Sequence, residues 1–391
     1  MAAKAGHVTA GDPDSQPQKH RRLHQLLAKC SDVKSIVFFL TCTAFLFHFS
    51  TGILYRLVYH SPSSVTTLSP PQLLNVSTVE PPMTAAEQEF DIIDTFETED
   101  KITLVRILNE ASMKEKKTVI VTMMNQAWAE PNSTFDAFLD GFYAGEGTER
   151  LLRHVVVVCL DNEAYSRCNE VHPRRCFLLK TTGVDFSGEK LFMVPDYLRM
   201  MWRRTEFLGS LLKLGYNFLF TDMDTMWLRD PFTRLFSEVD FQVAGDYYRF
   251  NGNSSDLRNK VNGGFNFVVA NRKTVEFYNY WYASRLRFPG KNEQVVLERI
   301  KHDLYIKQIG LTIRILDPVY FGNFCQPKWN ISKVCIMHGN CCSGKRTKVK
   351  DLRHVLQDWQ NYMSVVASGK ADGHKLGFRK PMNCWRRGRR H

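Results

Sequence analysis

Residues 214–232 read LGYNFLFTDMDTMWLRDPF, and this stretch decides the fold class. The apolar run at 218–220 predicts a buried strand, and Asp222 and Asp224 follow at its end. Residues two apart on a strand point to the same face, so both carboxylates would face the crevice where open α/β sheets bind ligands. Mg²⁺ and Mn²⁺ prefer such oxygen ligands together with substrate phosphates. The pair therefore predicts a divalent-metal site for a nucleotide-activated donor.

The sequence on either side of the acidic pair supports this interpretation. Residues 196–214 have the apolar spacing of an amphipathic helix, and Gly215 is well placed to end it. Downstream, RDPF at 229–232 supplies a turn, since proline cannot continue a central strand. The plainer alternative is an isolated Asp-x-Asp that merely begins a turn.

Strand and helix patterns alternate through the rest of the domain. The strand candidates are apolar runs at 118–122, 155–159, 217–220, 241–244 and 265–270. The helix candidates lie at 135–142, 196–214 and 274–284. Such alternation predicts an α/β fold with a mainly parallel central sheet.

A membrane anchor is predicted near the N-terminus. Residues 36–55 contain no Asp, Glu, Lys or Arg and are just long enough to span a bilayer, with a buried helix as the alternative. More basic residues precede this segment than follow it closely, which predicts a cytosolic N-terminus. The expected organisation is a cytosolic tail at 1–34, a transmembrane signal anchor at 35–57, a Ser/Thr/Pro-rich stem at 58–89 and a lumenal domain at 90–391.

The cysteines and glycosylation sequons fit a lumenal domain. Of the ten cysteines, eight follow the predicted anchor, and an even count in an oxidising compartment predicts disulfides, with their pairing left open. A zinc site is the alternative, but the adjacent Cys341 and Cys342 lack the paired C-x₂-C spacing of zinc ribbons. Sequons begin at Asn75, Asn132, Asn253 and Asn330.

Several ordered motifs resemble those of a known family. They are TVIVTMMNQAWAEP at 118–131, CLDNEAYSRC at 159–168, the stretch at 214–232, VNGGFNFVVANRKTVEFYNYW at 261–281 and HGNCCSGKRTKVKDL at 338–352. Together they look like the plant nucleotide-diphospho-sugar transferase family, which includes rhamnogalacturonan II xylosyltransferases and extensin arabinosyltransferases. The resemblance covers nearly all of residues 90–391. It implies a GT-A-like glycosyltransferase domain, a retaining reaction and a type II membrane protein of the Golgi.

A metal-ligand set follows from this resemblance. By position, Asp222 and Asp224 would coordinate Mn²⁺ (or Mg²⁺), and the ion would bridge the donor phosphates and stabilise the departing UDP. His338 is the candidate third ligand, with a purely structural histidine as the alternative. Lys345 or Lys348, in a flexible basic loop that contains glycines, would meet the phosphates.

Nucleotide-sugar contacts are expected at the ends of the first two strands. Thr122 and Asn125 follow the first strand and Asp161 follows the second, where related folds bind the nucleotide. Loop structure is the alternative for Asn125 and Asp161. Arg204 lies on the helix before the acidic pair, where similar enzymes place a basic residue near the donor sugar. A solvated helix face is the alternative for Arg204.

A sugar-binding wall is expected at Asn262, Gly263 and Gly264. These residues precede an apolar strand, and two glycines allow a ligand to approach the backbone closely. A plain turn is the alternative.

Two catalytic candidates, Asp246 and Gln294, resemble family positions near the donor sugar or acceptor. Many relatives have an aspartate where this chain has Asn292, which puts an acidic role there in doubt, although Glu293 follows it. For a retaining reaction the resemblance implies front-face attack, in which the leaving phosphate oxygen accepts the proton of the acceptor hydroxyl.

The formal charge of +12 is locally concentrated in the basic segment at 379–390. Acidic pectin would be a fitting partner for this segment, and a solvated tail is the plainer alternative. Nucleic acid is not an expected partner in the lumen.

Two other functions compete for the same motif. A phosphohydrolase of the haloacid dehalogenase type also places Asp-x-Asp after a strand, but its pattern continues with Thr or Val where this chain has Met226. It also needs a second aspartate where Phe250 stands. A non-catalytic, membrane-tethered glycan-binding protein would bind sugar without metal-dependent binding of UDP.

We therefore expect a retaining, metal-dependent glycosyltransferase. It would move a pentose or galactose from a UDP-sugar to a cell-wall polysaccharide or a hydroxyproline-rich glycoprotein.

Overall fold

The computed structural model describes residues 96–369 and 376–388. The predicted tail, anchor and stem at 1–89 lie outside the described residues, so these boundaries stay predictions. Within the described ranges, no helix has both the length and the apolar character needed to cross a membrane.

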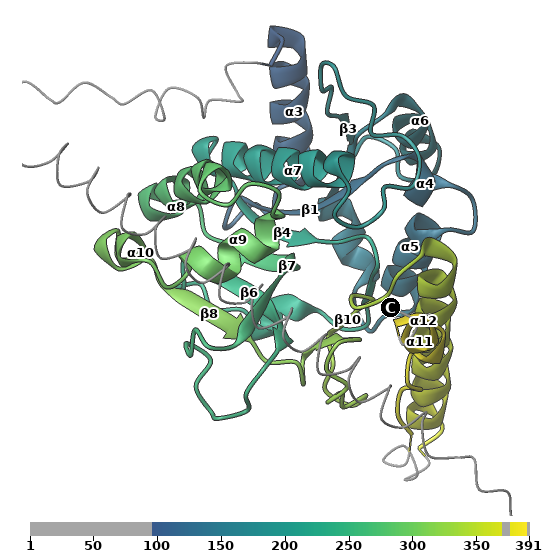
Figure 1. Cartoon of the computed structure of the whole chain (residues 1–391). Helices are drawn as coiled ribbons and strands as arrows, with labels where there is room; N and C mark the ends of the chain where they lie inside the picture. The colour runs from purple at the N-terminus through teal and green to yellow at the C-terminus, as the bar shows by residue number, and fades with distance from the viewer. Residues whose placement is uncertain (1–95, 370–375, 389–391) are drawn as a thin grey trace, which may run out of the picture. The chain divides into compact units, whose positions relative to one another are not determined.

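The central feature is a seven-stranded sheet with the order β3-β2-β1-β4-β7-β6-β8 (Figure 1). Its strands are β1 (Thr118–Met124), β2 (Val155–Cys159), β3 (Cys176–Leu178), β4 (Asn217–Thr221), β6 (Phe241–Tyr247), β7 (Lys260–Val268) and β8 (Ile313–Leu316). All pairs are parallel except those of β7, which is antiparallel to both β4 and β6. The predicted mainly parallel sheet is therefore confirmed.

Helices cover both faces of this sheet, which explains why its strands read as continuous apolar runs. On β1, Val119 and Val121 point into one hydrophobic core and Ile120 points into the other. The first core includes side chains of α3 (Thr98–Ala111), α7 (Pro195–Lys213), α8 (Arg272–Ala283), α9 (Glu293–Ile300) and α10 (Leu304–Gln308). The second includes side chains of α4 (Gln126–Ala129), α5 (Thr134–Ala144) and α6 (Asn162–Val171).

A small second sheet extends the domain beyond β4. It has the order β5-β10-β9 and consists of β5 (Thr225–Trp227), β9 (Phe321–Asn323) and β10 (Ile336–His338). Helix α11 (Lys345–Ala367) packs on it through Leu352, Val355 and Trp359, and α12 (Met382–Gly388) joins the same core through Cys384. Three short 3₁₀ helices lie at Glu149–His154, Pro231–Arg234 and Ser284–Leu286.

Three sequence predictions about local structure are wrong. The expected flexible basic loop is ordered, because α11 begins at Lys345 directly after Gly344, whose φ of 87° suits glycine. The segment 262–264 neither precedes a strand nor forms a turn, because it lies within β7. Strand β6 continues past the expected end at residue 244, so Asp246 lies within the strand.

Three disulfides tie the loops of the domain together. The pairs are Cys168–Cys176, Cys325–Cys341 and Cys342–Cys384, while Cys159 and Cys335 are free and buried. The prediction of disulfides is confirmed, and these six cysteines are not zinc ligands. Two of the bridges begin within four residues after His338, at Cys341 and Cys342, so they fix the chain that leaves β10.

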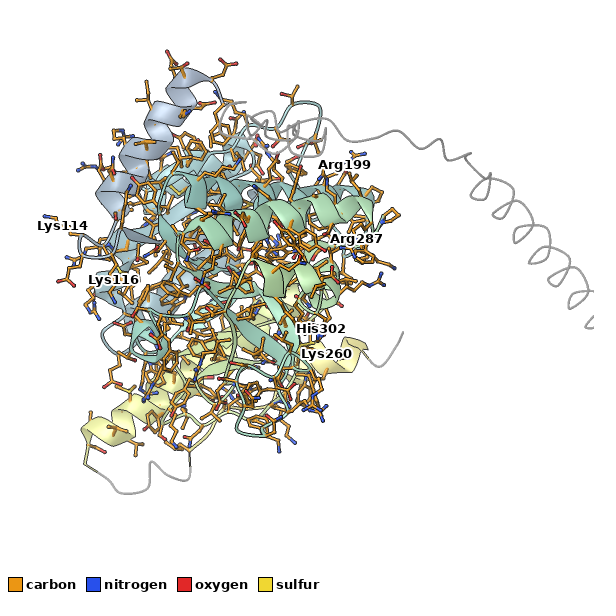
Figure 2. All side chains as sticks on the ribbon, turned by 90° about the vertical axis from the view of Figure 1, so that its left-hand side faces the viewer. Lys114, Lys116, Arg199, Lys260, Arg287 and His302 are labelled. Atoms are coloured by element: carbon orange, nitrogen blue, oxygen red, sulfur yellow. A yellow bond between two sulfur atoms is a disulfide. The ribbon has the colours of Figure 1, made fainter. Side chains whose placement is uncertain are left out.

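Positive charge is spread over the surface and is not confined to the C-terminal segment. Figure 2 shows Lys114 and Lys116 on one side of the domain and Arg199, Arg287 and Lys260 on the opposite side. Within the basic C-terminal segment, Arg379 donates from Nε to Asp358 on α11 at 2.8 Å. This residue therefore serves to hold the returning chain against α11 rather than to extend a free tail.

Candidate metal and donor site

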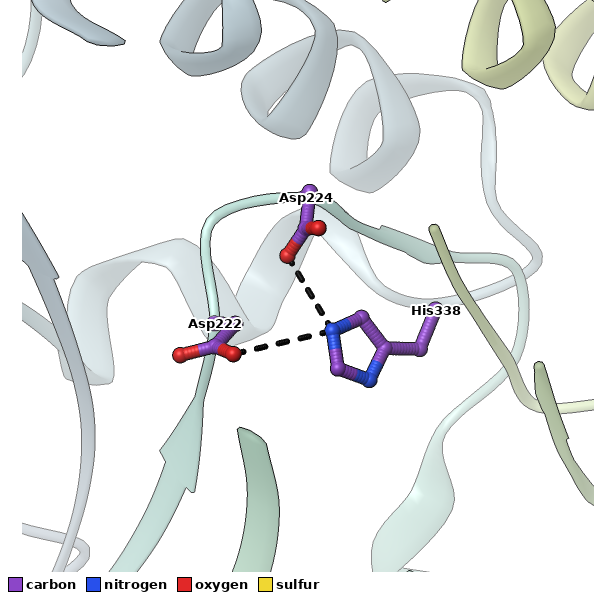
Figure 3. A group of neighbouring side chains, drawn as sticks. All are labelled: Asp222, Asp224 and His338. Carbon is purple, nitrogen blue, oxygen red and sulfur yellow. Dashed lines mark hydrogen bonds and ion pairs between the residues drawn. The ribbon is translucent and has the colours of Figure 1, made fainter. Parts of the chain in front are cut away.

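Asp222, Asp224 and His338 form a compact cluster where the two sheets meet (Figure 3). The two aspartates lie in the turn between β4 and β5, and His338 is the last residue of β10, which pairs with β5. His338 Nε2 lies 3.1 Å from Asp224 Oδ1 and 3.6 Å from Asp222 Oδ2. The structure thus brings together the three residues that the sequence predicted as metal ligands. Their ligand role stays a prediction.

The carboxylates converge for a different reason from the one expected. Strand β4 ends at Thr221, so the alternation of side chains along a strand does not set their direction. Instead the turn is fixed at both ends: the Asp222 N–H donates to the Gly264 carbonyl at 2.6 Å, and the Gly339 N–H donates to the Asp224 carbonyl at 2.8 Å. The register of β7 and β10 therefore determines where the two carboxylates lie.

Gly264 makes room for the cluster. A Cβ atom on this residue would lie 2.2 Å from Asp222 Oδ2 and 2.5 Å from His338 Cε1. Neither contact is sterically allowed, so only glycine can occupy this position of β7 without displacing the cluster. The predicted close approach of a backbone at 262–264 is thus present, within a strand.

The Asp224 carboxylate is buried and carries two cationic partners. Lys348 Nζ on α11 lies 2.5 Å from Oδ2, and His338 contacts Oδ1. Burial alone would raise the pKa of Asp224, but the positive charges of Lys348 and His338 hold it well below the ordinary range. Burial would likewise lower the pKa of His338, but Asp224 and Asp222 raise it.

Asp222 has its own cationic partner, Arg204 on α7. Arg204 is only 5% exposed and bonds Asp222 Oδ1 at 2.7 Å and Glu293 Oε1 at 2.5 Å. Its guanidinium also lies over the Phe220 ring, 4.8 Å from the centroid. The alternative of a solvated helix face is therefore wrong for Arg204. Burial raises the pKa of Glu293, with Arg204 opposing the shift.

The two catalytic candidates, Asp246 and Gln294, are bonded to each other. Asp246 accepts from the amide groups of Gln294 at 2.9 Å, Asn262 at 2.8 Å and Asn340 at 2.6 Å. Gln294 also accepts from the Gly263 N–H at 3.1 Å. Burial raises the pKa of Asp246, against the effect of these amides and of His338.

Asn340 was not singled out from the sequence, and Glu293 was mentioned only as the acid that follows Asn292. Asn340 lies two residues after His338, in the HGN of the C-terminal motif, and that spacing was the available signal. Asn292, which replaces the aspartate of many relatives, caps α9 by accepting from the Val295 N–H at 3.0 Å. The acid next to it, Glu293, is the one that pairs with Arg204.

The predicted nucleotide contacts at the first two strands are not part of the cluster. Asn125 Nδ2 donates to the carbonyls of Phe186 and Gly188 at 2.8 and 2.7 Å. Asp161 caps α6 and also accepts from the Gln126 N–H at 2.7 Å. These bonds match the loop-structure alternative. Thr122 is buried, and its hydroxyl has no protein partner.

Lys345 is held away from the carboxylates. Its Nζ donates to the Ala127 carbonyl at 2.8 Å and to Glu130 at 2.5 Å. Of the two lysines that the sequence offered for phosphate contact, Lys348 is therefore the one beside the cluster.

The donor set fits a divalent cation. The ligand atoms of Asp222, Asp224 and His338 all lie within 4.8 Å of one another, and ions of this class form bonds of about 2.1 Å. Two carboxylates with one imidazole suit Mn²⁺ better than Mg²⁺, which prefers oxygen ligands throughout. One feature departs from the usual pattern, because His338 Nδ1 is buried without the acceptor that metal-binding histidines normally have.

Comparison with known proteins identifies the family. Residues 150–352 match the model of the family described as nucleotide-diphospho-sugar transferase, and the matched range includes Asp222, Asp224 and His338. This range is more than half of the chain. The chain belongs to the nucleotide-diphospho-sugar transferase family. The resemblance stated from the motifs is thereby confirmed, and so is the predicted enzyme class, a glycosyltransferase with a nucleotide-sugar donor.

Individual relatives of this transferase differ widely in similarity. An uncharacterised protein of Arabidopsis thaliana is 56% identical over 290 residues, which cover 74% of this chain and 76% of that protein. The UDP-D-xylose:L-fucose alpha-1,3-D-xylosyltransferase 1 of the same plant is 21% identical over 239 residues, which cover 56% of this chain and 66% of the enzyme. Among solved structures, apo mouse xyloside xylosyltransferase 1 shares 13% identity over 57% of this chain and 98% of its own, with a TM-score of 0.31.

Family membership and the mainly parallel sheet of this transferase fit a GT-A-like α/β fold.

Proposed function

We propose that this transferase moves a sugar from a UDP-sugar to a glycan acceptor with retention of configuration, and that it depends on Mn²⁺. The observation that carries the proposal is the convergence of Asp222, Asp224 and His338 at the end of β4 in a member of the nucleotide-diphospho-sugar transferase family. The three residues are the proposed ligands of the cation.

The partners of the two aspartates leave one oxygen of each for the cation. Arg204 bonds Oδ1 of Asp222, so that Oδ2 faces His338. Lys348 bonds Oδ2 of Asp224, so that Oδ1 faces His338. When bound, the cation acts as a Lewis acid that neutralises the negative charge developing on the leaving diphosphate. Lys348, which contacts Asp224, would add its positive charge at the same place.

The surroundings of Asp246 fit front-face attack. In that reaction the bond from the anomeric carbon to the phosphate oxygen breaks, and the bond to the acceptor oxygen forms on the same face. The leaving phosphate oxygen takes the proton of the acceptor hydroxyl, so no side chain serves as nucleophile. Asp246 accepts from three amide groups, which suits a residue that positions its neighbours rather than one that attacks.

The proposed donor sugar is a pentose or galactose. The named Arabidopsis thaliana relative uses UDP-D-xylose, and this supports a UDP-linked pentose. For the acceptor we propose a cell-wall polysaccharide or a hydroxyproline-rich glycoprotein. The anchor predicted at 35–57 supports a type II location in the Golgi membrane, with the catalytic domain in the lumen.

Mn²⁺-dependent release of UDP tests this function. The full-length chain, solubilised in detergent, is assayed with UDP-xylose, UDP-arabinose and UDP-galactose beside the double variant Asp222→Ala/Asp224→Ala. We expect one donor to release UDP, and we expect the release to disappear when Mn²⁺ is chelated or when both aspartates are replaced. The control Asp100→Ala removes a surface ion pair with Lys180 and should leave the release unchanged.

The same assay can contradict the proposed function. A folded wild-type chain that neither releases nor binds UDP with Mn²⁺ would contradict the enzyme assignment. If that chain still bound glycans, the non-catalytic glycan-binding alternative would take its place.

A further inference from the structure

The segment between β3 and α7, residues 179–194, leaves two large apolar side chains in solvent. Leu191 is 67% exposed and Phe192 is 72% exposed. The same segment buries Phe186 in the core under the sheet, so it is anchored rather than detached. Single exposed apolar residues are common, and the position of this pair decides whether it has a role.

The middle of the segment is attached to Asn125, just after β1, and to the first residue of α11. Asn125 donates to the carbonyls of Phe186 and Gly188, and the N–H of Lys345 donates to Glu189 at 3.2 Å. Lys345 is the first residue of α11, on which Lys348 contacts Asp224.

The C-terminal end of the segment contacts α7, the helix that carries Arg204. The Phe192 ring packs against the Tyr197 ring, with centroids 5.3 Å apart and planes inclined at 60°. Tyr197 lies in the first turn of α7, seven residues before Arg204 and therefore on the same face of the helix. Arg204 bonds Asp222 Oδ1 at 2.7 Å. Phe192 therefore lies in solvent beside a residue on the helix face that carries Arg204.

We propose that Phe192, supported by Tyr197, forms a stacking platform for a sugar ring of the acceptor glycan. The C–H groups on one face of a sugar ring form an apolar surface, which packs well on an aromatic ring. This inference rests on the proposed function and assigns the acceptor side of the same site.

The exposure of Phe192 favours contact with the acceptor rather than with the donor. The donor diphosphate belongs at the cluster, where Asp224 and His338 are buried. The acceptor arrives from solvent, and the Phe192 ring is exposed to solvent beside Tyr197. Glu189 and Lys190, three and two residues before Phe192 in the same segment, carry hydrogen-bonding groups of the kind that bind the hydroxyls at the edge of a sugar.

The test compares three substitutions at one position in the full-length chain. Phe192→Ala removes the ring, Phe192→Leu keeps apolar volume without an aromatic face, and Phe192→Tyr keeps the face. Acceptor KM and kcat are measured with a panel of pectic oligosaccharides and hydroxyproline-rich glycopeptides. UDP binding with Mn²⁺ and UDP release without acceptor are measured in parallel. The control Leu304→Ala removes a side chain on α10 that is 67% exposed.

We expect Phe192→Ala and Phe192→Leu to raise the acceptor KM about tenfold, the change that corresponds to one lost contact of moderate strength. UDP binding, release without acceptor, and the Phe192→Tyr and Leu304→Ala variants should resemble the wild type. An acceptor KM for Phe192→Ala equal to that of the control would overturn the stacking platform and leave the proposed transfer reaction standing. Equal losses of UDP binding and transfer would also overturn it, since the segment would then shape the donor site. A wild-type chain without Mn²⁺-dependent UDP release would instead remove the proposed function on which the platform rests.

Discussion

Asp224 and Asp240 are two buried carboxylates at opposite edges of the same sheet. Asp224 follows the C-terminal end of β4, and Asp240 precedes the N-terminal end of β6, which runs in the same direction. Asp240 accepts from the Thr312 N–H at 2.9 Å and from the Thr312 hydroxyl at 2.8 Å. It also pairs with Lys273 at 3.2 Å. Asp224 has two partners, Lys348 and His338, and both are basic side chains.

The two edges therefore serve different purposes. The partners of Asp240 are Thr312 just before β8, Asn271 at the N-cap of α8 and Lys273 on α8, so its bonds hold the ends of separate elements together. The partners of Asp224 are Lys348 and His338, at the cluster. A cation can compete with them for the carboxylate oxygens, and a diphosphate can compete with Asp224 for Lys348. In both cases burial would raise the pKa and the partners hold it below the ordinary value. At one edge the bonds of Asp240 hold elements of the fold together. At the other edge Asp224 has basic partners that a bound cation can replace.

The largest effect expected is at Gly264. Gly264→Ala places a Cβ atom 2.2 Å from Asp222 Oδ2, so the carboxylate must move away from His338. Misplacement of a reacting group by about 1 Å costs on the order of 100-fold in rate. We expect a loss of this size in Mn²⁺-dependent UDP release, measured beside the melting temperature to show that the variant is folded.

Gly377 provides the control for this prediction. A Cβ atom there would have no heavy atom within 4 Å. Gly377→Ala should keep the full activity. Equal activity of the two alanine variants would show that the space at Gly264 is not what preserves the cluster.

The next effect concerns the opposite edge of the sheet. Asp240→Asn removes charge-assisted hydrogen bonds from Thr312, Asn271 and Lys273, and should lower the free energy of unfolding by about 2 kcal/mol. The pKa of Asp240 is below its unfolded value, so its charge stabilises the fold above about pH 4 and this contribution is lost as pH falls through the lowered pKa.

Urea unfolding at several pH values measures this difference. The gap between wild type and Asp240→Asn should be full at neutral pH and should shrink on acidification, while UDP release at neutral pH stays unchanged. A gap that is independent of pH would mean that the charge of Asp240 does not contribute.

A smaller effect is expected at Glu293, which links the fold to the site. Glu293→Gln keeps the shape of the side chain but removes the charge that pairs with Arg204 at 2.5 Å. Arg204 would then bond Asp222 alone and hold it less firmly, so Mn²⁺ affinity, measured by UDP binding at varied Mn²⁺, should fall about tenfold. Surface carboxylate Glu276, paired with Arg272, supplies the control variant Glu276→Gln. Unchanged Mn²⁺ affinity in Glu293→Gln would show that the ion pair between Glu293 and Arg204 does not help to position Asp222.

Local sequence predicted much of the fold and only part of the site. The apolar runs at β1, β2, β4 and β6 and the helix at α7 were recognisable because their side-chain spacing repeats over short distances. Strands of three or four residues, such as β3 and β8, are too short to show a repeat. The start of α11 was mistaken for a loop because its basic residues and preceding glycine resemble a phosphate-binding turn.

By itself, the sequence determined the alternation of strands and helices, the family, and the identity of Asp222, Asp224 and His338 as one group, because each of these is expressed in residue type and order. Tertiary structure alone decided that Arg204 is buried, that Lys348 faces Asp224 and that Asn125 and Asp161 are used within the fold. Partners such as Lys348 and Asp224 are 124 residues apart, and only the pairing of β5 with β10 and the packing of α11 bring them together. Local spacing carries no information about such contacts, because they depend on how separate elements pack.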